Sequence, residues 1–439
     1  SELAIVEPGK GKLKTIGEPA LYSSASFSPD GDYLLVESLV EPWSHEVAWW
    51  RFASEVEVWD EKGEHVATVA SLPLADEVPT QGVAEGPRRV SWRATADHEL
   101  YWVEALDGGD PMAEVDHRDR LMRLDAPFDG EPEEVFRAEH RFYSWQWGAD
   151  DGTLMIQQYE RIRRWRHVWL LDVDEGTARP WFDLNLADRY NDPGSPVFRQ
   201  LDNGRWVMRQ EDDAIYFSGS GATEQGDRPF LDLRDMHGDE AERLFRSPPD
   251  RYERFVAFAG DDDRFVIRSE SATDVPNYHL VTLEGRIDAP EGEAQRAHSR
   301  EPITSFEDPT PELRQIEKRI VRYEREDGVP LSFNLHLPPG YEEGDGPLPT
   351  VVYAYPLEYS SAEVAGQVRG SEQRFSRFWA ASHLYFLLRG YAVLDDTAMP
   401  MVGDPESVYD TFVEQLVDDA EAAVAKAVDM GIADPERIG

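Results

Sequence analysis

The first chemistry to test in this chain is nucleophilic attack by a serine, and the motif that would carry it is missing. A serine nucleophile is often held on a sharp strand-to-helix turn with the pattern G-x-S-x-G. No G-x-S-x-G occurs in the 439 residues, and the nearest approach, Ser218–Gly221, has a serine where the first glycine must be. Such a serine also needs a histidine as general base. His336 and His383 fall on a predicted strand and a predicted helix, where we expect packing or surface histidines.

The elements that would position such a serine are predicted in residues 319–439. They are, in order, a hairpin of strands 319–323 and 331–337, a buried strand 350–355, a helix 376–389, a strand 391–394 and a helix 408–430. Asp327-Gly328 supplies the hairpin turn, and Gly390 and Gly431 supply the helix caps. This order predicts the first half of an α/β-hydrolase domain, ending before the nucleophile elbow. We therefore expect the triad to lie beyond this chain.

Residues 1–305 are predicted to be all-β and repetitive. Strand starts rich in aromatic residues recur near Ser26, Ser91, Ser144, Pro196 and Phe255, several followed by Asp/Gly turns such as Asp150–Gly152. A strand, a turn and a second strand repeating at roughly 50 to 60 residues are typical of β-propeller blades. We expect a partial β-propeller with about five visible blades in residues 1–305, in preference to a β-sandwich. Residues 3–16 are predicted to form a hairpin that belongs to another blade.

A change of composition marks a predicted linker, residues 306–318, which is rich in Pro, Asp and Thr. Before it, the only basic run of the chain, Arg161–Arg166, is predicted to form a strand. Its alternation would place Arg161, Arg163 and Trp165 on one face. Such a face could line the propeller tunnel and attract acidic peptides. A solvated face with local charge balance is the interpretation that we favour.

Several longer stretches carry a resemblance to a known family. They are V-E-A-L-D-G-G-D-P from Val103, D-R-Y-N-D-P-G-S-P from Asp188, A-G-Q-V-R-G-S from Ala365, V-E-Q-L-V from Val413 and A-D-P-E-R-I-G from Ala433. With the L-P-P-G-Y turn, the chain resembles the glutamyl endopeptidase branch of the prolyl oligopeptidase family of serine peptidases. The resemblance covers nearly the whole chain, which would be a fragment without the N-terminal blades and without the catalytic Ser, Asp and His.

The resemblance implies hydrolysis of peptide bonds after glutamate, with peptides as substrates and no cofactor. The partner of the chain would be the missing C-terminal half of the hydrolase domain, and the chain alone is expected to be inactive. Acylaminoacyl- or dipeptidyl-peptidase activity stays open as an alternative. A different class also stays open, in which the propeller is a non-catalytic binding module.

The resemblance also implies roles for two residues. In this family a tyrosine after the third strand donates its hydroxyl to the oxyanion, and Tyr353 occupies the matching position, with Tyr355 as the alternative. A glutamyl-specific enzyme needs a cationic pocket, for which arginine suits a carboxylate because its fork binds bidentately. Arg369, in the loop after the tyrosine strand, is the candidate for that pocket. No metal ligands are expected.

The composition is strongly acidic, with 87 acidic and 44 basic residues and a formal charge of −43. Lysine occurs only at Lys10, Lys12, Lys14, Lys62, Lys318 and Lys426, and cysteine is absent. Such a surface repels itself unless salt screens it, which predicts the cytoplasm of a halophilic organism. Nucleic acid is not expected as a partner because it needs a basic face. A membrane is not expected either, since no run of 18 apolar residues occurs.

The acidic surface predicts that folding depends on salt. Because added salt screens repulsion between exposed carboxylates, the melting temperature should rise as KCl is increased from low to molar concentrations. Thermal denaturation followed by circular dichroism measures this. A melting temperature that stays constant across the series would contradict halophilic adaptation.

Overall fold

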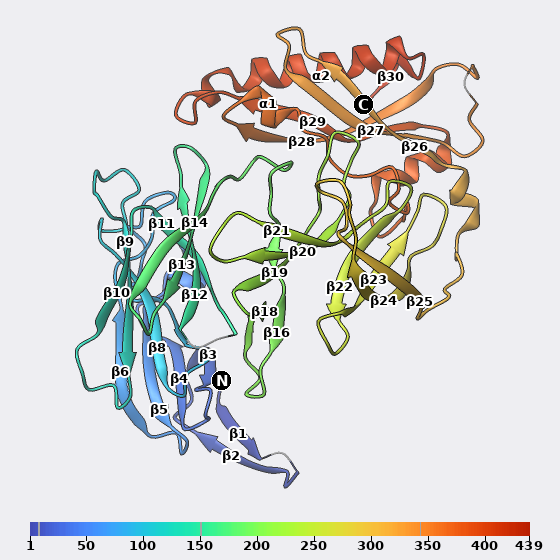
Figure 1. The fold of residues 1–439 in the computed structure, drawn as a ribbon. Coiled ribbons are helices and arrows are strands. Elements are labelled where there is room, and N and C mark those ends of the chain that lie inside the picture. The colour runs from blue at the N-terminus through green and yellow to red at the C-terminus, as the bar shows by residue number, and fades with distance from the viewer. Residues whose placement is uncertain (8, 150–151, 343) are drawn as a thin grey trace. The chain divides into compact units, whose positions relative to one another are not determined.

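The computed structural model describes residues 1–7, 9–149, 152–342 and 344–439, and consists mainly of β-sheets (Figure 1). Contacts divide the chain into two compact units. The first is made of Ser1–Glu160, Arg166–Asp183 and Phe198–Asp212. The second is made of Arg161–Trp165, Leu184–Val197 and Asp213–Gly439. Over the described residues, none of the helices combines the length and apolar character needed to cross a membrane.

Three four-stranded sheets, each built from strands consecutive in the sequence, make up most of the first unit. The first sheet contains β3 (Leu21–Phe27), β4 (Tyr33–Leu39), β5 (Ser54–Asp60) and β6 (His65–Leu72). The second contains β7 (Arg88–Trp92), β8 (Glu99–Ala105), β9 (Asp119–Asp125) and β10 (Glu133–Ala138). The third contains β11 (Arg141–Trp147), β12 (Thr153–Glu160), β13 (Trp165–Asp172) and β14 (Thr177–Asn185). The smaller elements are β1 (Leu3–Glu7) paired with β2 (Lys12–Ile16), η1 (Trp49–Arg51), β16 (Phe198–Gln200) paired with β17 (Trp206–Met208), and β18 (Gln210–Glu211).

Two further sheets lie in the second unit. The fourth sheet has five strands, of which β15 (Ser195–Pro196), β19 (Ala214–Gly219), β20 (Phe230–Asp235) and β21 (Ala241–Arg246) belong to this unit and lie in this order. The fifth contains β22 (Tyr252–Phe258), β23 (Arg264–Glu270), β24 (Asn277–Arg286) and β25 (Arg296–Pro302). The expected repeat starts lie on β3, β7, β11, β15 and β22, the first strand of each sheet. Of the expected turn at 150–152, Asp150 and Asp151 lie outside the described residues.

The cores of these sheets explain why the repeat has this sequence pattern. In the first four sheets the second strand carries a run of consecutive buried residues, for example Leu154–Ile156 on β12. A strand that is apolar on both faces must be covered on both faces. Clusters of buried side chains provide this cover by joining the first sheet to the second, the second to the third, and the fourth to the fifth.

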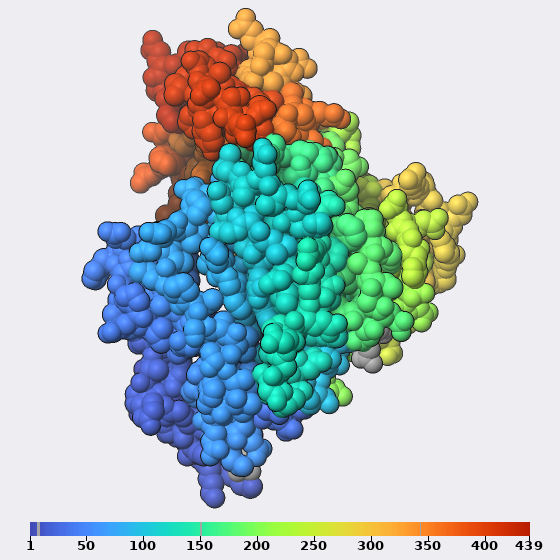
Figure 2. Space-filling view, turned by 90° about the vertical axis from the view of Figure 1, so that its left-hand side faces the viewer, coloured from blue at the N-terminus to red at the C-terminus, as the bar shows by residue number. Residues whose placement is uncertain are grey.

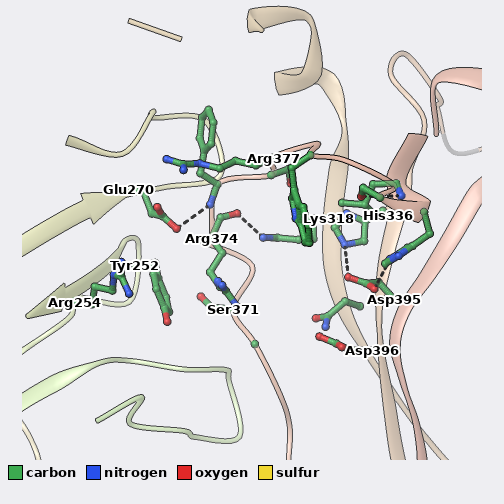
Figure 3. Close-up of a pocket in the computed structure, with 18 of the residues that line it drawn as sticks. Tyr252, Arg254, Glu270, Lys318, His336, Ser371, Arg374, Arg377, Asp395 and Asp396 are labelled. Atoms are coloured by element: carbon green, nitrogen blue, oxygen red, sulfur yellow. Dashed lines mark hydrogen bonds and ion pairs between the residues drawn. The ribbon is translucent and has the colours of Figure 1, made fainter. Parts of the chain in front are cut away.

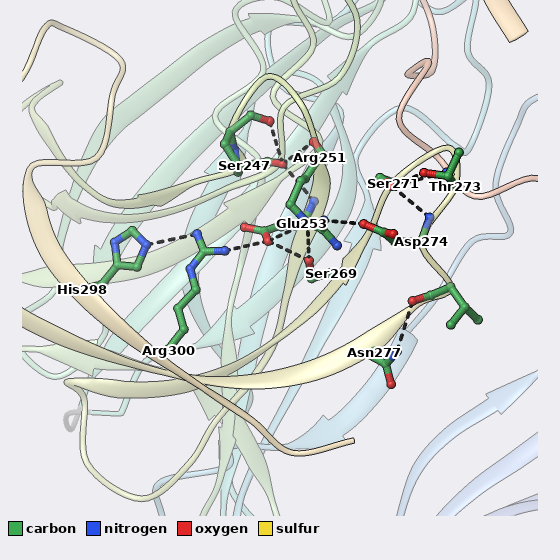
Figure 4. Close-up of polar contacts among 12 residues, drawn as sticks. Ser247, Arg251, Glu253, Ser269, Ser271, Thr273, Asp274, Asn277, His298 and Arg300 are labelled. Atoms are coloured by element: carbon green, nitrogen blue, oxygen red, sulfur yellow. Dashed lines mark hydrogen bonds and ion pairs between the residues drawn. The ribbon is translucent and has the colours of Figure 1, made fainter. Parts of the chain in front are cut away.

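A buried carboxylate ties the strands of the fifth sheet together (Figure 4). Glu253 on β22 is fully buried. Its Oε1 accepts hydrogen bonds from Ser269 Oγ on β23 and from Arg300 Nη1 on β25, each at 2.7 Å. Because a buried charge is tolerated only when it is paired and hydrogen-bonded, this network stabilises one arrangement of the three strands.

The C-terminal sheet of the second unit has the order β26-β27-β29-β28-β30. Its strands are β26 (Glu317–Glu324), β27 (Pro330–Leu337), β28 (Leu348–Tyr359), β29 (Ala392–Val402) and β30 (Ala433–Ile438), and its helical elements are η2 (Pro311–Gln315), α1 (Ala362–Ala365), η3 (His383–Arg389), η4 (Val408–Thr411) and α2 (Phe412–Asp429). β28 runs parallel to β29 and β30, whereas β26 with β27 and β27 with β29 are antiparallel pairs.

α2 covers this sheet through a narrow strip of small residues. Ala423 and Ala427, one helical turn apart, are buried, and Ala427 packs with Phe333 and Leu394 of the sheet. Alanines at this spacing allow the helix axis to approach the strands closely. The opposite side of α2 faces outward, and the C-terminal part that contains it lies at the surface in the space-filling view (Figure 2).

The predicted hairpin and the predicted C-terminal helix are confirmed, whereas three other expectations are wrong. The expected helix 376–389 is reduced to η3, because Ala380 has a positive φ of 43° that a right-handed helix cannot contain. The strand expected at Arg161–Arg166 is wrong, because Arg161–Arg164 form the turn between β12 and β13, with Arg164 at φ 56°. The strand at 350–355 exists but is not uniformly buried. In addition, β30 was not expected, because polar residues interrupt its apolar pattern.

A buried ion pair fixes α2 to the hairpin of β26 and β27. Asp419 of α2 is fully buried, and its Oδ1 lies 2.9 Å from Nη1 of Arg325, which is also buried. Burial raises the pKa of Asp419 to about 6, although Arg325 opposes the shift. Removing one partner of such a pair leaves the other charge buried and unpaired.

Asp419→Ala should therefore destabilise the fold strongly. We expect the free energy of unfolding to fall by about 3–5 kcal/mol, the usual effect of breaking a buried pair. Denaturant titration of the variant in KCl measures this. Asp418→Ala, at the exposed neighbouring position, is the matched control and should change stability by no more than about 0.5 kcal/mol. Equal effects of the two substitutions would contradict the structural role of the pair.

Candidate functional site

The candidate site lies where the parallel strands β28 and β29 carry polar residues at their middle. Val352 pairs with Leu394 and Ala354 pairs with Thr397, so that β29 has one extra residue at this point. The bulge places Asp395 and Asp396 opposite Tyr353, and Asp396 takes a positive φ of 48°. Bulges re-aim side chains and occur often beside active sites. Here the bulge puts two consecutive carboxylates at the middle of the strand pair.

His383 connects the tyrosine to these carboxylates. Its ring stacks on the ring of Tyr353, with 3.9 Å between centroids and 11° between planes. Nε2 of His383 lies 2.7 Å from Oδ1 of Asp395. On the other side, Nε2 of the buried His336 lies 3.8 Å from Oδ2 of the same carboxylate (Figure 3). His383 is therefore held by Asp395, and it in turn limits the orientation of the Tyr353 ring.

Burial controls the charge states of this cluster. It lowers the pKa of His336 to about 3, with Lys318 and His383 adding to the shift, so His336 is neutral near pH 7. Burial, with a contribution from Asp396, raises the pKa of Asp395. Burial also lowers the pKa of Lys318 to about 8, helped by Arg374. Tyr353 is 51% exposed, and among the described residues no group forms a hydrogen bond with its hydroxyl.

A cavity of about 490 Å³ adjoins this cluster (Figure 3). Side chains of the fifth sheet, of the segment 370–384 and of the bulge line it. Its charged lining residues are the cations Arg254, Arg268, Lys318, Arg374 and Arg377 and the anions Glu270, Asp395 and Asp396. An excess of cations is unusual in a chain with twice as many acidic as basic residues.

Arg369 and Tyr355 lie together in a different, smaller cavity. It has a volume of about 60 Å³, and Asp396 lines both cavities. The guanidinium of Arg369 contacts the hydroxyl of Tyr359, and its Cζ lies 5.9 Å from the ring centroid. The structure thus brings Arg369 together with Tyr355, and Tyr353 together with His383. No sequence pattern pointed to Asp395, Lys318 or Arg374 as site residues. Lysine is rare in this chain, so the presence of Lys318 was a usable signal of a functional position.

One group of side chains in the first unit could hold a metal ion. Ligand atoms of His140, Glu160 and His167 lie within 4.8 Å of one another. The two imidazole rings are stacked at 4.3 Å, and Nδ1 of His167 lies 3.1 Å from Asp183 Oδ1. Imidazole and carboxylate ligands suit Zn²⁺, and a carboxylate on the second ring nitrogen is usual for a metal-bound histidine. The candidate hydrolytic chemistry does not need this group.

Comparison with solved structures shows the fold. The acylaminoacyl peptidase of Pyrococcus horikoshii matches with a TM-score of 0.52 and 14% identity over 100% of this chain and 62% of that chain. A puromycin-hydrolysing peptidase of Mycobacterium tuberculosis matches with a TM-score of 0.52 and 18% identity, over 100% and 61% of the two chains. The chain therefore shares the fold of prolyl oligopeptidase-type peptidases. No family model matches the sequence.

Comparison with curated proteins gives a closer similarity. The chain is 37% identical to the "Probable glutamyl endopeptidase, chloroplastic" of Oryza sativa subsp. japonica, over 98% of this chain and 47% of that protein. The protein of the same name from Arabidopsis thaliana is also 37% identical, over 98% of this chain and 46% of that protein. The chain thus spans about half the length of the curated relatives that it matches. By sequence it is a homologue of the proteins named glutamyl endopeptidase, which confirms the resemblance drawn from its motifs.

Proposed function

We propose that these 439 residues belong to a serine peptidase that hydrolyses peptide bonds after glutamate. The observation that carries the proposal is 37% identity over 98% of the chain to two proteins named glutamyl endopeptidase. The structural neighbour named acylaminoacyl peptidase is only 14% identical, so sequence favours the glutamyl activity over that alternative. It also favours an enzyme over a non-catalytic binding module.

The fold assignment that accompanies this function is a partial β-propeller followed by part of an α/β-hydrolase domain. Five sheets, four with four strands and one with five, are propeller blades in residues 1–305. A linker covers 306–318, and residues 319–439 form the first half of the hydrolase domain. Two observations support this. In four of the sheets the strands follow one another in sequence order, and buried clusters join successive sheets within each unit.

The reaction is an acyl transfer through a triad supplied by residues outside this sequence, in which no G-x-S-x-G occurs. The serine oxygen attacks the peptide carbonyl carbon while a histidine takes the serine proton. The C–N bond then breaks, and that proton goes to the leaving amine. Water releases the acyl group by the reverse sequence of transfers. The chain alone is inactive, and the rest of the hydrolase domain is its partner.

Tyr353 is the residue of this chain that takes part in the chemistry, as donor of a hydrogen bond to the oxyanion. Its exposed hydroxyl without a described partner, and its ring held by His383, support that role. A donor that is already oriented loses little entropy when the tetrahedral intermediate forms. Tyr355 is 77% exposed and has no comparable ring contact among the described residues, which makes it the weaker candidate.

Arg369 is proposed to bind the glutamate side chain of the substrate. It is half-buried, and it makes no ion pair with a described carboxylate, although acidic residues outnumber basic ones. Its contact with Tyr359 holds the guanidinium in place. A bidentate pair with a substrate carboxylate would satisfy the remaining donors of Arg369.

We also propose that the protein works in the cytoplasm of a halophilic organism. The net charge of −43 supports this proposal.

Replacing Tyr353 in the complete enzyme tests the catalytic assignment. Tyr353→Phe keeps the ring stacked on His383 and removes only the hydroxyl. The loss should lower kcat by roughly 10²-fold or more and leave KM nearly unchanged, since the bond forms only in the transition state. Steady-state hydrolysis of a glutamyl peptide measures both constants.

Tyr355→Phe is the matched control and should leave kcat within about twofold. A large decrease in Tyr355→Phe with normal kcat in Tyr353→Phe would move the role to Tyr355. Normal kcat in both variants would remove tyrosine from the mechanism. Failure of the unmodified complete protein to cleave glutamyl peptides at all would disprove the proposed activity.

A further inference from the structure

The cavity lined by His383, Asp395 and Asp396 carries more positive charge than one substrate carboxylate requires. Five cations line it, whereas only three anions do. Two of those anions are already paired: Glu270 lies 2.6 Å from Arg268, and Asp395 binds His383. Only Asp396 lacks a described ion-pair partner. The charge balance of the lining is thus opposite to that of the chain.

Four of the five cations are available to a ligand. Arg254, Arg374 and Arg377 are exposed and make no ion pair with a described carboxylate. Nζ of Lys318 donates to the backbone oxygen of Arg374 at 2.5 Å, which is a neutral acceptor. Figure 3 shows the ammonium group of Lys318 reaching the main chain of Arg374. Free guanidinium groups close to an ammonium group form a typical site for carboxylates.

The position of Lys318 gives a physical reason to expect an anion. Burial and the neighbouring Arg374 disfavour its charged form, which lowers its pKa to about 8. A negative ligand would favour the charged form of Lys318 and relieve the repulsion between the two cations. The cavity therefore gains more from an anionic ligand than from a neutral one.

The two cavities lie on either side of one residue, Asp396, which lines both. Arg369 lines the smaller cavity, and His383, on which Tyr353 stacks, lines the larger one. One peptide that crosses this bulge can place one side chain in each cavity. Because the Arg369 cavity has room for a single group, the larger cavity is left for a second.

We propose that the larger cavity binds a second carboxylate of the substrate, so that the site selects peptides with an additional acidic residue near the glutamate at the cleaved bond. Lys318 and Arg374 are the residues that contact this carboxylate, and Arg377 and Arg254 strengthen its attraction. The proposal rests on the proposed function, since it assigns a second recognition position to the same peptide site. It gives the site a preference for acidic segments over isolated glutamates.

Binding to the 439-residue chain tests this without any cleavage. Four heptapeptides, acetylated and amidated so that their termini are uncharged, are compared. One carries no glutamate, one carries a central glutamate, and two carry the central glutamate and a second one, either two residues before it or two residues after it. Isothermal titration calorimetry is run at the lowest KCl concentration at which the chain is folded. A peptide with two glutamates should bind about tenfold more tightly than the peptide with one, the effect of one charge-assisted hydrogen bond.

Substitutions test whether the cavity causes this gain in peptide affinity. Lys318→Gln and Arg374→Gln should each remove most of the difference between one and two glutamates and leave binding of the single-glutamate peptide unchanged. Arg322→Gln, exposed on the same strand as Lys318 and outside the cavity, is the matched control and should change neither affinity. Arg377→Gln should remove part of the affinity gain. It replaces Lys318→Gln or Arg374→Gln if the melting curve of either variant shows that it does not fold.

Equal affinity for one and two glutamates would overturn the proposal, as would an undiminished gain in both Lys318→Gln and Arg374→Gln. Absence of binding of every peptide would overturn it as well. Cleavage by the complete protein is a separate measurement. Selective binding of the two-glutamate peptide without cleavage would disprove the peptidase function and leave the cavity as an acidic-peptide site.

Discussion

The parallel pairing of β28 with β29 is the constraint on which the candidate site depends. Its register brings Tyr353 opposite the extra residue of β29, and that bulge turns Asp395 towards His383. The positive φ of Asp396 is strained for a residue with a Cβ atom. Such strain persists only where the surrounding structure imposes it. Here the buried strand Ala392–Leu394 on one side of the bulge and buried Met399 and Met401 on the other hold it in place.

In the rest of the molecule, the many acidic residues require that buried carboxylates be paired with cations. Buried carboxylates such as Asp419 and Glu253 are each matched by an arginine, because an unpaired buried charge would cost more than the fold can offset. Arginine serves this purpose better than lysine since its planar fork satisfies several acceptors at once. The larger cavity, lined by His383, is the exception, because there the cations exceed the carboxylates. An imbalance of this kind is stabilised when a ligand supplies the missing negative charge.

The sequence predicted the strands well and the local backbone exceptions poorly. The repeat starts and the hairpin of β26 and β27 follow from alternation and turn residues, which are local properties. The helix expected at 376–389 failed at Ala380, and the strand expected at Arg161–Arg166 failed at Arg164, where positive φ values are imposed on residues that show no sign of them in sequence. The surroundings of Tyr353 could not be predicted, because its contact with His383 of η3, and that of His383 with Asp395 of β29, join segments distant in sequence.

Under the proposed function, the same geometry separates two tasks of the site. Tyr353 is oriented by an aromatic stack, which fixes the ring plane and leaves the hydroxyl free, so it suits charge that develops during the reaction. Arg369 is oriented by Tyr359 and suits a charge that is present before the reaction. Binding energy gained from a fixed substrate carboxylate acts equally on the ground state and the transition state, whereas the oxyanion hydrogen bond proposed for Tyr353 would act on the transition state alone. Arg369 lines the smaller cavity, whereas Tyr353 stacks on His383, which lines the larger one. This separation allows substrate specificity and reaction rate to change independently.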